Sequence, residues 1–213
     1  MNVLNVVLSG SISAIFTMLS IKNFSSEKVN FKNSILYVCI YFIFLVASCF
    51  IFDGLTRLLL NLIIMITSLY FSLFKKNISD SVYYTIVYNV FAAFFEVLLS
   101  LIFVGLLKFD INVYENFSFS LLVFSICNCL SVFFISKIKP LDKALQKFNR
   151  IISKNNKDWI YVFICIILVI LLITFNEYNL KSNVEFYINI FITIFMFVSI
   201  IYVVYNKIQK KRS

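Results

Sequence analysis

Two ionisable side chains lie inside long apolar stretches of this sequence, Glu96 and Arg57. Glu96 lies near the middle of the stretch NVFAAFFEVLLS. A charge at the centre of a bilayer costs roughly 2.5–3.5 kcal/mol on insertion scales, so this carboxyl group should face other helices, be protonated or meet a partner. Glu96 is therefore a candidate ligand-binding residue. The alternative is a neutral carboxyl group hydrogen-bonded to a nearby Asn or Ser.

Arg57 lies about one turn inside the third apolar stretch, just after Asp53. Its guanidinium group can snorkel to the outer interface, which its position near the end of the stretch favours. The alternative is that Arg57 caps an outward-facing cavity and meets a carboxylate or a peptide carbonyl there. We take Arg57 and Asp53, with Glu96, as the candidate ligand-binding residues.

The sequence contains no histidine, and this absence excludes much catalytic chemistry. Cys–His and Ser–His nucleophilic pairs need a histidine, as do histidine-ligated zinc sites. The five cysteines all lie in apolar stretches, where we expect buried thiols that act as small hydrophobic side chains. No glycine-rich phosphate loop occurs. We therefore expect no enzyme, no catalytic residue, no metal site and no cofactor.

Hydrophobic residues make up 62% of the 213 residues, whereas soluble domains lie near 45–50%. So much apolar surface must face lipid or another protein. The net charge of +9 falls in short runs between apolar stretches, as in loops that flank membrane helices. The lipid bilayer is thus the expected partner, and nucleic acid is not.

The apolar stretches predict an all-α, polytopic membrane helix bundle with six to seven transmembrane helices in a single domain over residues 1–213. A bilayer core needs roughly 20 helical residues, and continuous apolar runs favour helices over a barrel of alternating strands. The expected helices cover 3–21, 34–52, 55–74, 81–107, 117–137, 158–175 and 186–206. Between the second and third, Asp53-Gly54 leaves almost no loop. These two helices form a very tight hairpin, or one of them is partly re-entrant.

Most lysines and arginines fall at alternate helix ends, which gives the expected orientation. Lys and Arg favour the cytoplasmic side of a membrane. We therefore expect a multi-pass plasma-membrane protein with its N-terminus outside and its C-terminus in the cytoplasm. The basic residues assigned to the cytoplasmic side are Lys22, Lys28, Lys32, Lys75, Lys76, Lys137, Lys139, Lys143, Lys147, Arg150, Lys154, Lys157, Lys207, Lys210, Lys211 and Arg212.

The segment 140–153 predicts an amphipathic helix in the largest cytoplasmic loop. Apolar residues recur there at helical spacing with basic residues between them, and Pro140 suits a first helical turn. Such a helix lies on the inner leaflet, where Lys143, Lys147 and Arg150 would contact anionic lipid. The alternative is a loop whose charges only hold the inner end in place. Three amides at membrane depth, Asn61, Asn89 and Asn128, are expected to join helices by hydrogen bonds rather than to bind a ligand.

Three segments carry a resemblance to a known family: FIFDGLTRLLLNLIIMI, KIKPLDKALQKFNRIISKNNKDWI and IIYVVYNKIQKKRS. With the helix layout, they resemble the N-terminal sensor half of quorum-sensing peptide-receptor histidine kinases of the accessory-gene-regulator C type. The resemblance covers nearly all of the chain. It implies that outer loops and outer helix ends bind a small secreted peptide, and that the last helix passes the signal to a kinase.

The sequence departs from that family because residues 207–213 are all that follows the last expected helix, with no phosphoacceptor histidine and no ATP-binding domain. We expect a non-catalytic sensor domain: an excised one, a truncated paralogue that sequesters peptide, or a partner of a separate kinase, with a homodimer as a further possible partner state. The peptide would bind near Arg57, Asp53 and the loops 108–116 and 176–185. Two alternatives stay open. One is a small permease subunit that works with a separate ATPase, and the other is an immunity or assembly protein acting by lateral contact.

Overall fold

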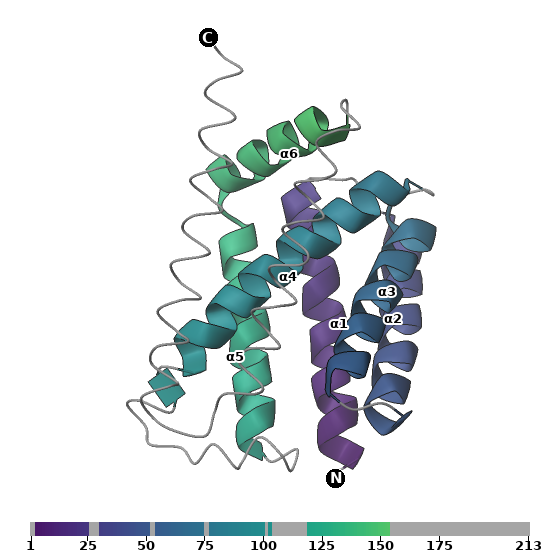
Figure 1. Cartoon of the computed structure of the whole chain (residues 1–213), viewed down its shortest axis with the longest axis vertical. Coiled ribbons are helices and arrows are strands. Elements are labelled where there is room, and N and C mark those ends of the chain that lie inside the picture. The colour runs from purple at the N-terminus through teal and green to yellow at the C-terminus, as the bar shows by residue number, and fades with distance from the viewer. Residues whose placement is uncertain are drawn as a thin grey trace.

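The computed structural model describes residues 3–25, 30–51, 54–74, 77–100, 102–103 and 119–153 (Figure 1). Within these ranges the chain is helical and has no strand, which confirms the all-α prediction there. Asp53 and the expected helices at 158–175 and 186–206 lie outside the described residues. The helices are α1 (Val3–Ser25), α2 (Phe31–Ile51), α3 (Gly54–Ser72), α4 (Ile78–Ser100), α5 (Phe119–Ser136) and α6 (Lys139–Ser153).

The apolar helices indicate a membrane protein. By length and composition, α1 and α2 are each able to cross a bilayer, and the bent pair of α5 and α6 would be a third span if taken as one. The apolar part of α3, Leu60–Ser72, is shorter than a full span. These findings concern the described residues alone, so the count of six to seven transmembrane helices stays a prediction.

Helix α1 lies at the centre of the bundle and packs against α2, α4, α5 and α6 (Figure 1). Its inward face carries small side chains at helical spacing, including Gly10, Ala14 and Ser20. A Cβ atom added at Gly10 would lie 3.0 Å from Cγ2 of Val46 and 3.2 Å from Cδ2 of Leu45. Small residues of this kind let membrane helices approach closely. Because Gly10 has no side chain, α2 packs closely against α1 at this position.

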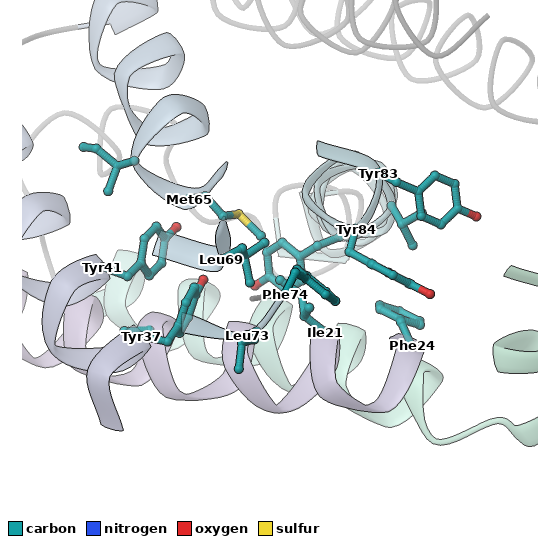
Figure 2. Packing of buried hydrophobic residues seen from close by; sticks show 14 of the residues in the cluster. Ile21, Phe24, Tyr37, Tyr41, Met65, Leu69, Leu73, Phe74, Tyr83 and Tyr84 are labelled. Atoms are coloured by element: carbon teal, nitrogen blue, oxygen red, sulfur yellow. The ribbon is translucent and has the colours of Figure 1, made fainter. Parts of the chain in front are cut away.

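Large side chains fill the space where α1, α2, α3 and α4 meet (Figure 2). The rings of Phe74 and Tyr84 stack with centroids 5.3 Å apart, and those of Phe24 and Phe91 stack at 5.4 Å. Stacked pairs of this kind contribute about 0.5–1.5 kcal/mol beyond the area that they bury. They join the end of α3 and the end of α1 to α4.

Large hydrophobic side chains also cover the outside of the bundle. Ile43, Phe71 and Phe134 are each about 60% exposed. A soluble protein rarely exposes such residues over a contiguous surface, whereas lipid tails solvate them well. Cys39 belongs to this outer surface, since its side chain is exposed, while Cys129 is buried. The expectation that all the cysteines are buried is therefore wrong for Cys39, because the lipid-facing side of α2 accepts a thiol as readily as the interior does.

Interhelical hydrogen bonds between small polar groups add to the packing. Ser48 on α2 donates to Asn61 on α3 at 2.8 Å, so α2 and α3 pair directly as a hairpin. Asn89 donates within α4 to the carbonyl of Thr85 and lies 3.6 Å from the sulfur of Met65 on α3. The expected role as a link between helices is thus seen for Asn61, and more weakly for Asn89.

The close approach at Gly10 gives a first prediction. Gly10→Leu should destabilise the protein by about 1–3 kcal/mol, because the new side chain would be forced against Val46 and Leu45. Leu8→Phe is the matched control, since it adds volume at an exposed position of the same helix. Thermal unfolding of the two variants in detergent micelles measures the difference. Equal melting temperatures for both variants and the wild type would contradict the close contact.

Candidate functional site

The N-terminus of α4 is built around two polar side chains. The side-chain oxygen of Asn77 accepts a hydrogen bond from the backbone N–H of Asp80 at 3.3 Å. In return, the amide nitrogen of Asn77 donates to Oδ2 of Asp80 at 2.7 Å. This is the reciprocal arrangement of an N-terminal cap, and a carboxylate is favoured there by the helix dipole. The cap fixes the position of the Asp80 carboxylate.

The same carboxylate also binds α6. Asn149, which is 9% exposed, donates from its amide nitrogen to Oδ1 of Asp80 at 2.7 Å, across 69 residues of sequence. One turn further along α4, the hydroxyl group of Tyr83 donates to the backbone carbonyl of Leu145 at 2.9 Å. These two hydrogen bonds hold the first turns of α4 to the second half of α6. We call Asn77, Asp80, Tyr83, Leu145 and Asn149 the α6 junction.

Helix α6 is also tied to α1 and α5. Helices α5 and α6 meet at a bend of 79°, so α6 lies across one end of the bundle (Figure 1). Just before the bend, Asn23 on α1 donates to the hydroxyl group of Ser136 at 3.0 Å. At the bend itself, Nζ of Lys137 lies 4.4 Å from the centroid of the Phe133 ring, within range of a cation–π interaction. The angle of α6 is therefore fixed from both of its ends.

The two faces of α6 differ sharply. Leu141 and Leu145 pack against the hydrophobic core of the bundle. Lys139, Lys143 and Lys147 are exposed on the other side. The last turn of α1, with Lys22, and the first turn of α2, with Lys32, lie at this same end (Figure 1). Basic residues from α6, from the end of α1 and from the start of α2 thus lie at one end of the bundle.

Asp142, an acidic residue of α6, lies in a less favourable environment for a charged carboxylate than Asp80 does. Asp142 is half-buried, and this burial raises the pKa of its carboxyl group. Its Oδ1 atom has no hydrogen-bond partner among the described residues. The carboxylates of Asp80 and Asp142 therefore differ, since the first is held by two amides and the second is only desolvated.

The structure places two of the three candidate ligand-binding residues, Arg57 and Glu96, away from α6 (Figure 1). Arg57 lies in the first turn of α3, and Asp53 lies outside the described residues. Glu96 lies towards the end of α4, and its side chain is exposed. The start of α3 and the end of α4 lie on opposite sides of α1 (Figure 1). A ligand that touches Arg57 and Glu96 together would have to bridge the end of the bundle opposite to α6.

The predicted amphipathic segment forms a helix, since Lys143, Lys147 and Arg150 all lie in α6, and their contact with the inner leaflet stays a prediction. The α6 junction itself was not predicted from the sequence. One signal was present: Asp80 follows Lys75 and Lys76 closely at the start of an apolar stretch, and an acid in that position favours a partner. No pattern in the sequence identifies that partner as Asn149.

Comparisons with protein families, with curated proteins and with solved structures find no match to this chain. The resemblance to peptide-receptor kinases therefore rests on the three sequence segments quoted for it. The function has to be argued from the geometry of the bundle.

The α6 junction gives a second prediction. Asp80→Ala should leave the buried amide of Asn149 without its acceptor, at a cost of about 1–3 kcal/mol. Asn149→Ala should have a similar effect, and the double variant should show a coupling energy on the order of 1 kcal/mol. Amide hydrogen exchange in α6, measured on protein in nanodiscs, should accelerate in each single variant.

The control for this prediction is Asp142→Ala, which removes a carboxylate on α6 whose Oδ1 is unpaired among the described residues. It should leave the exchange of α6 at the wild-type rate or slow it, because a desolvated charge is removed. Wild-type exchange in Asp80→Ala would show that Asp80 does not hold α6.

Proposed function

We propose that this chain is a non-catalytic sensor domain of the cell membrane, which binds a secreted peptide on its outer side and reports binding through α6. The observation that carries the proposal is the α6 junction. Asp80 and Tyr83 hold α6 to α4, and the bend after Ser136 holds it to α5. A helix fixed to two others at one end of a bundle must move when those two helices shift.

The proposed orientation puts α6 in the cytoplasm, the N-terminus outside and the C-terminus inside. It is supported by the gathering of basic residues at one end, since lysine and arginine favour the cytoplasmic side. The exposed Lys143 and Lys147 would then face anionic headgroups of the inner leaflet, with Arg150 on the same helix. Each basic residue near such a surface contributes about 1 kcal/mol of attraction.

The proposed ligand follows from the resemblance to peptide-receptor sensor halves. The peptide would contact the end of the bundle opposite to α6, which includes the start of α3 with Arg57. It can shift the arrangement of the helices only by its differential affinity for two states. A coupling energy of about 1–3 kcal/mol is typical, and this is comparable to the strength of the two hydrogen bonds of the α6 junction. The downstream partner would be a separate kinase or a second copy of the chain.

The permease alternative draws on the same α6, because an in-plane cytoplasmic helix can also dock on a separate ATPase. It needs a polar path across the membrane that includes Glu96. Among the described residues, the Glu96 side chain is exposed on α4. The sensor function has the further support of the α6 junction, which joins α6 to α4.

The orientation gives a third prediction. In a variant without native cysteines, a single cysteine at Lys147 should react with an impermeant maleimide only after the cells are opened. A single cysteine at Glu177, placed outside by the sequence, should react on intact cells. Mass-tag gel shifts quantify both reactions. The reverse pattern would invert the topology and remove the basis for an outer peptide site.

Peptide binding gives a fourth prediction. The chain in nanodiscs, incubated with the peptide fraction of medium conditioned by the source organism, should retain a peptide that mass spectrometry detects. Arg57→Ala should reduce retention about tenfold, the effect of one lost charged hydrogen bond. Lys143→Ala is the matched control, since it removes a cation at the α6 end and should leave retention unchanged. Failure to retain any peptide from that medium would contradict the receptor function.

A further inference from the structure

The interior of the bundle contains a group of hydroxyl and thiol side chains from four helices. Tyr37 and Tyr41 come from α2, Thr17 from α1, Tyr88 from α4 and Cys129 from α5. All are buried, with exposed fractions from 0% for Thr17 and Tyr37 to 7% for Tyr88 and Cys129. We call these five side chains the polar core.

The members of the polar core are close neighbours. The rings of Tyr37 and Tyr41 stack with centroids 5.5 Å apart, and their hydroxyl groups point the same way, into the bundle (Figure 2). Tyr88 lies beside Cys129, and Tyr37 and Tyr41 both lie near Tyr88. Three phenols, one alcohol and one thiol thus share one region of an otherwise apolar interior.

Two of these groups lack the hydrogen bonds that burial demands. Neither the hydroxyl oxygen of Tyr37 nor Oγ1 of Thr17 has a partner among the described residues. Thr17 lies beside the Tyr88 hydroxyl group, but no well-aligned hydrogen bond joins them. An unsatisfied buried hydroxyl group costs about 1–3 kcal/mol, and in proteins such groups are nearly always paired with protein or with ordered water.

The functional groups of the polar core indicate what kind of molecule could bind there. Phenol, alcohol and thiol groups are neutral at pH 7, so the site offers no counter-charge to an ion. Its unpaired hydroxyl groups each donate and accept, which suits a small neutral molecule that does both. The surrounding space is filled by large side chains such as Met65 and Leu69 (Figure 2). We propose that the polar core is a buried hydration site, in which water bridges Tyr37 and Thr17.

Polar side chains continue along α1 from the polar core towards α6. Thr17, Ser20 and Asn23 follow one another at intervals of three residues on the inward side of the helix. Ser20 is fully buried, and its hydroxyl group also has no partner among the described residues. Asn23 donates to Ser136 at the end where α6 lies. At a rise of about 1.5 Å per residue, Thr17 is only about 9 Å from Asn23 along the helix.

Radiolytic footprinting of the full chain in nanodiscs tests the proposal directly. X-ray pulses generate hydroxyl radicals from bound water, so a fully buried side chain is modified only where water touches it. Tyr37 should be modified several-fold faster than Phe24, which is equally buried at 0% exposure in the apolar part of the core. Equal, slow modification of both rings would overturn the proposal.

The sign of a stability change provides the second test. If water satisfies its hydroxyl group, Tyr37→Phe should raise the unfolding equilibrium constant roughly fivefold, the effect of a lost hydrogen bond. If the hydroxyl group is dry, the same variant should be as stable as the wild type or more stable, which would overturn the proposal. Tyr70→Phe is the matched control, because the Tyr70 ring on α3 is partly exposed. It should change the unfolding equilibrium constant less than twofold.

A double-variant cycle distinguishes a shared water from two separate ones. Thr17→Val and Tyr37→Phe should show an interaction of at least about twofold in the unfolding constant, although no direct hydrogen bond joins the two side chains. Additive effects would show that no molecule bridges them. The footprinting result remains decisive if either variant fails to fold.

Discussion

Helix α1 presents a face of small side chains to the centre of the bundle, and the positions of the other helices depend on that face. At Gly10 an added Cβ would already lie 3.0 Å from Cγ2 of Val46, so a larger residue would force the facing side chains of α2 to shift. Lipid tails solvate apolar side chains as well as a protein core does, so helices in a bilayer are held by close packing and hydrogen bonds rather than by the hydrophobic effect. That explains why Ser9 of α1 also lies 3.2 Å from Ser125 of α5. Contacts of this kind require backbones that nearly touch.

The same helix links the interior of the bundle to α6. Its inward side leads from Thr17 in the polar core to Asn23, which bonds Ser136 one residue before the bend region. Helix α4 provides a second link, since it carries Tyr88 in the polar core and Asp80 in the α6 junction. A change in packing around the polar core would therefore reach α6 along two helices at once. Each link ends in a hydrogen bond, from Asn23 to Ser136 in one and from Asn149 to Asp80 in the other, and such bonds have discrete arrangements that can switch between states.

The sequence predicted the class of the fold well, because the length of an apolar run and the period of an amphipathic one are local properties. Residues 140–153 illustrate this, since the spacing of their apolar residues predicted an amphipathic helix, and α6 is a helix whose Leu141 and Leu145 pack against the core. Pairings between distant residues are not local, and nothing in the sequence joins Asp80 to Asn149. The direction in which a side chain faces also depends on the neighbouring helices. Glu96 shows this, because its cost in lipid predicted a partner but not the side of α4 on which to find one.

The absence of charge in the polar core bears on what the bundle can do. A proton or cation path needs groups that change or balance charge, whereas these phenol, alcohol and thiol groups can only exchange hydrogen-bond partners. Exchanging one such partner changes the free energy by about 0.5–1.5 kcal/mol. That is comparable to the roughly 1–3 kcal/mol by which a bound effector typically biases two conformations. Exchange of hydrogen bonds in the polar core thus has the size of the change that the proposed sensor would need.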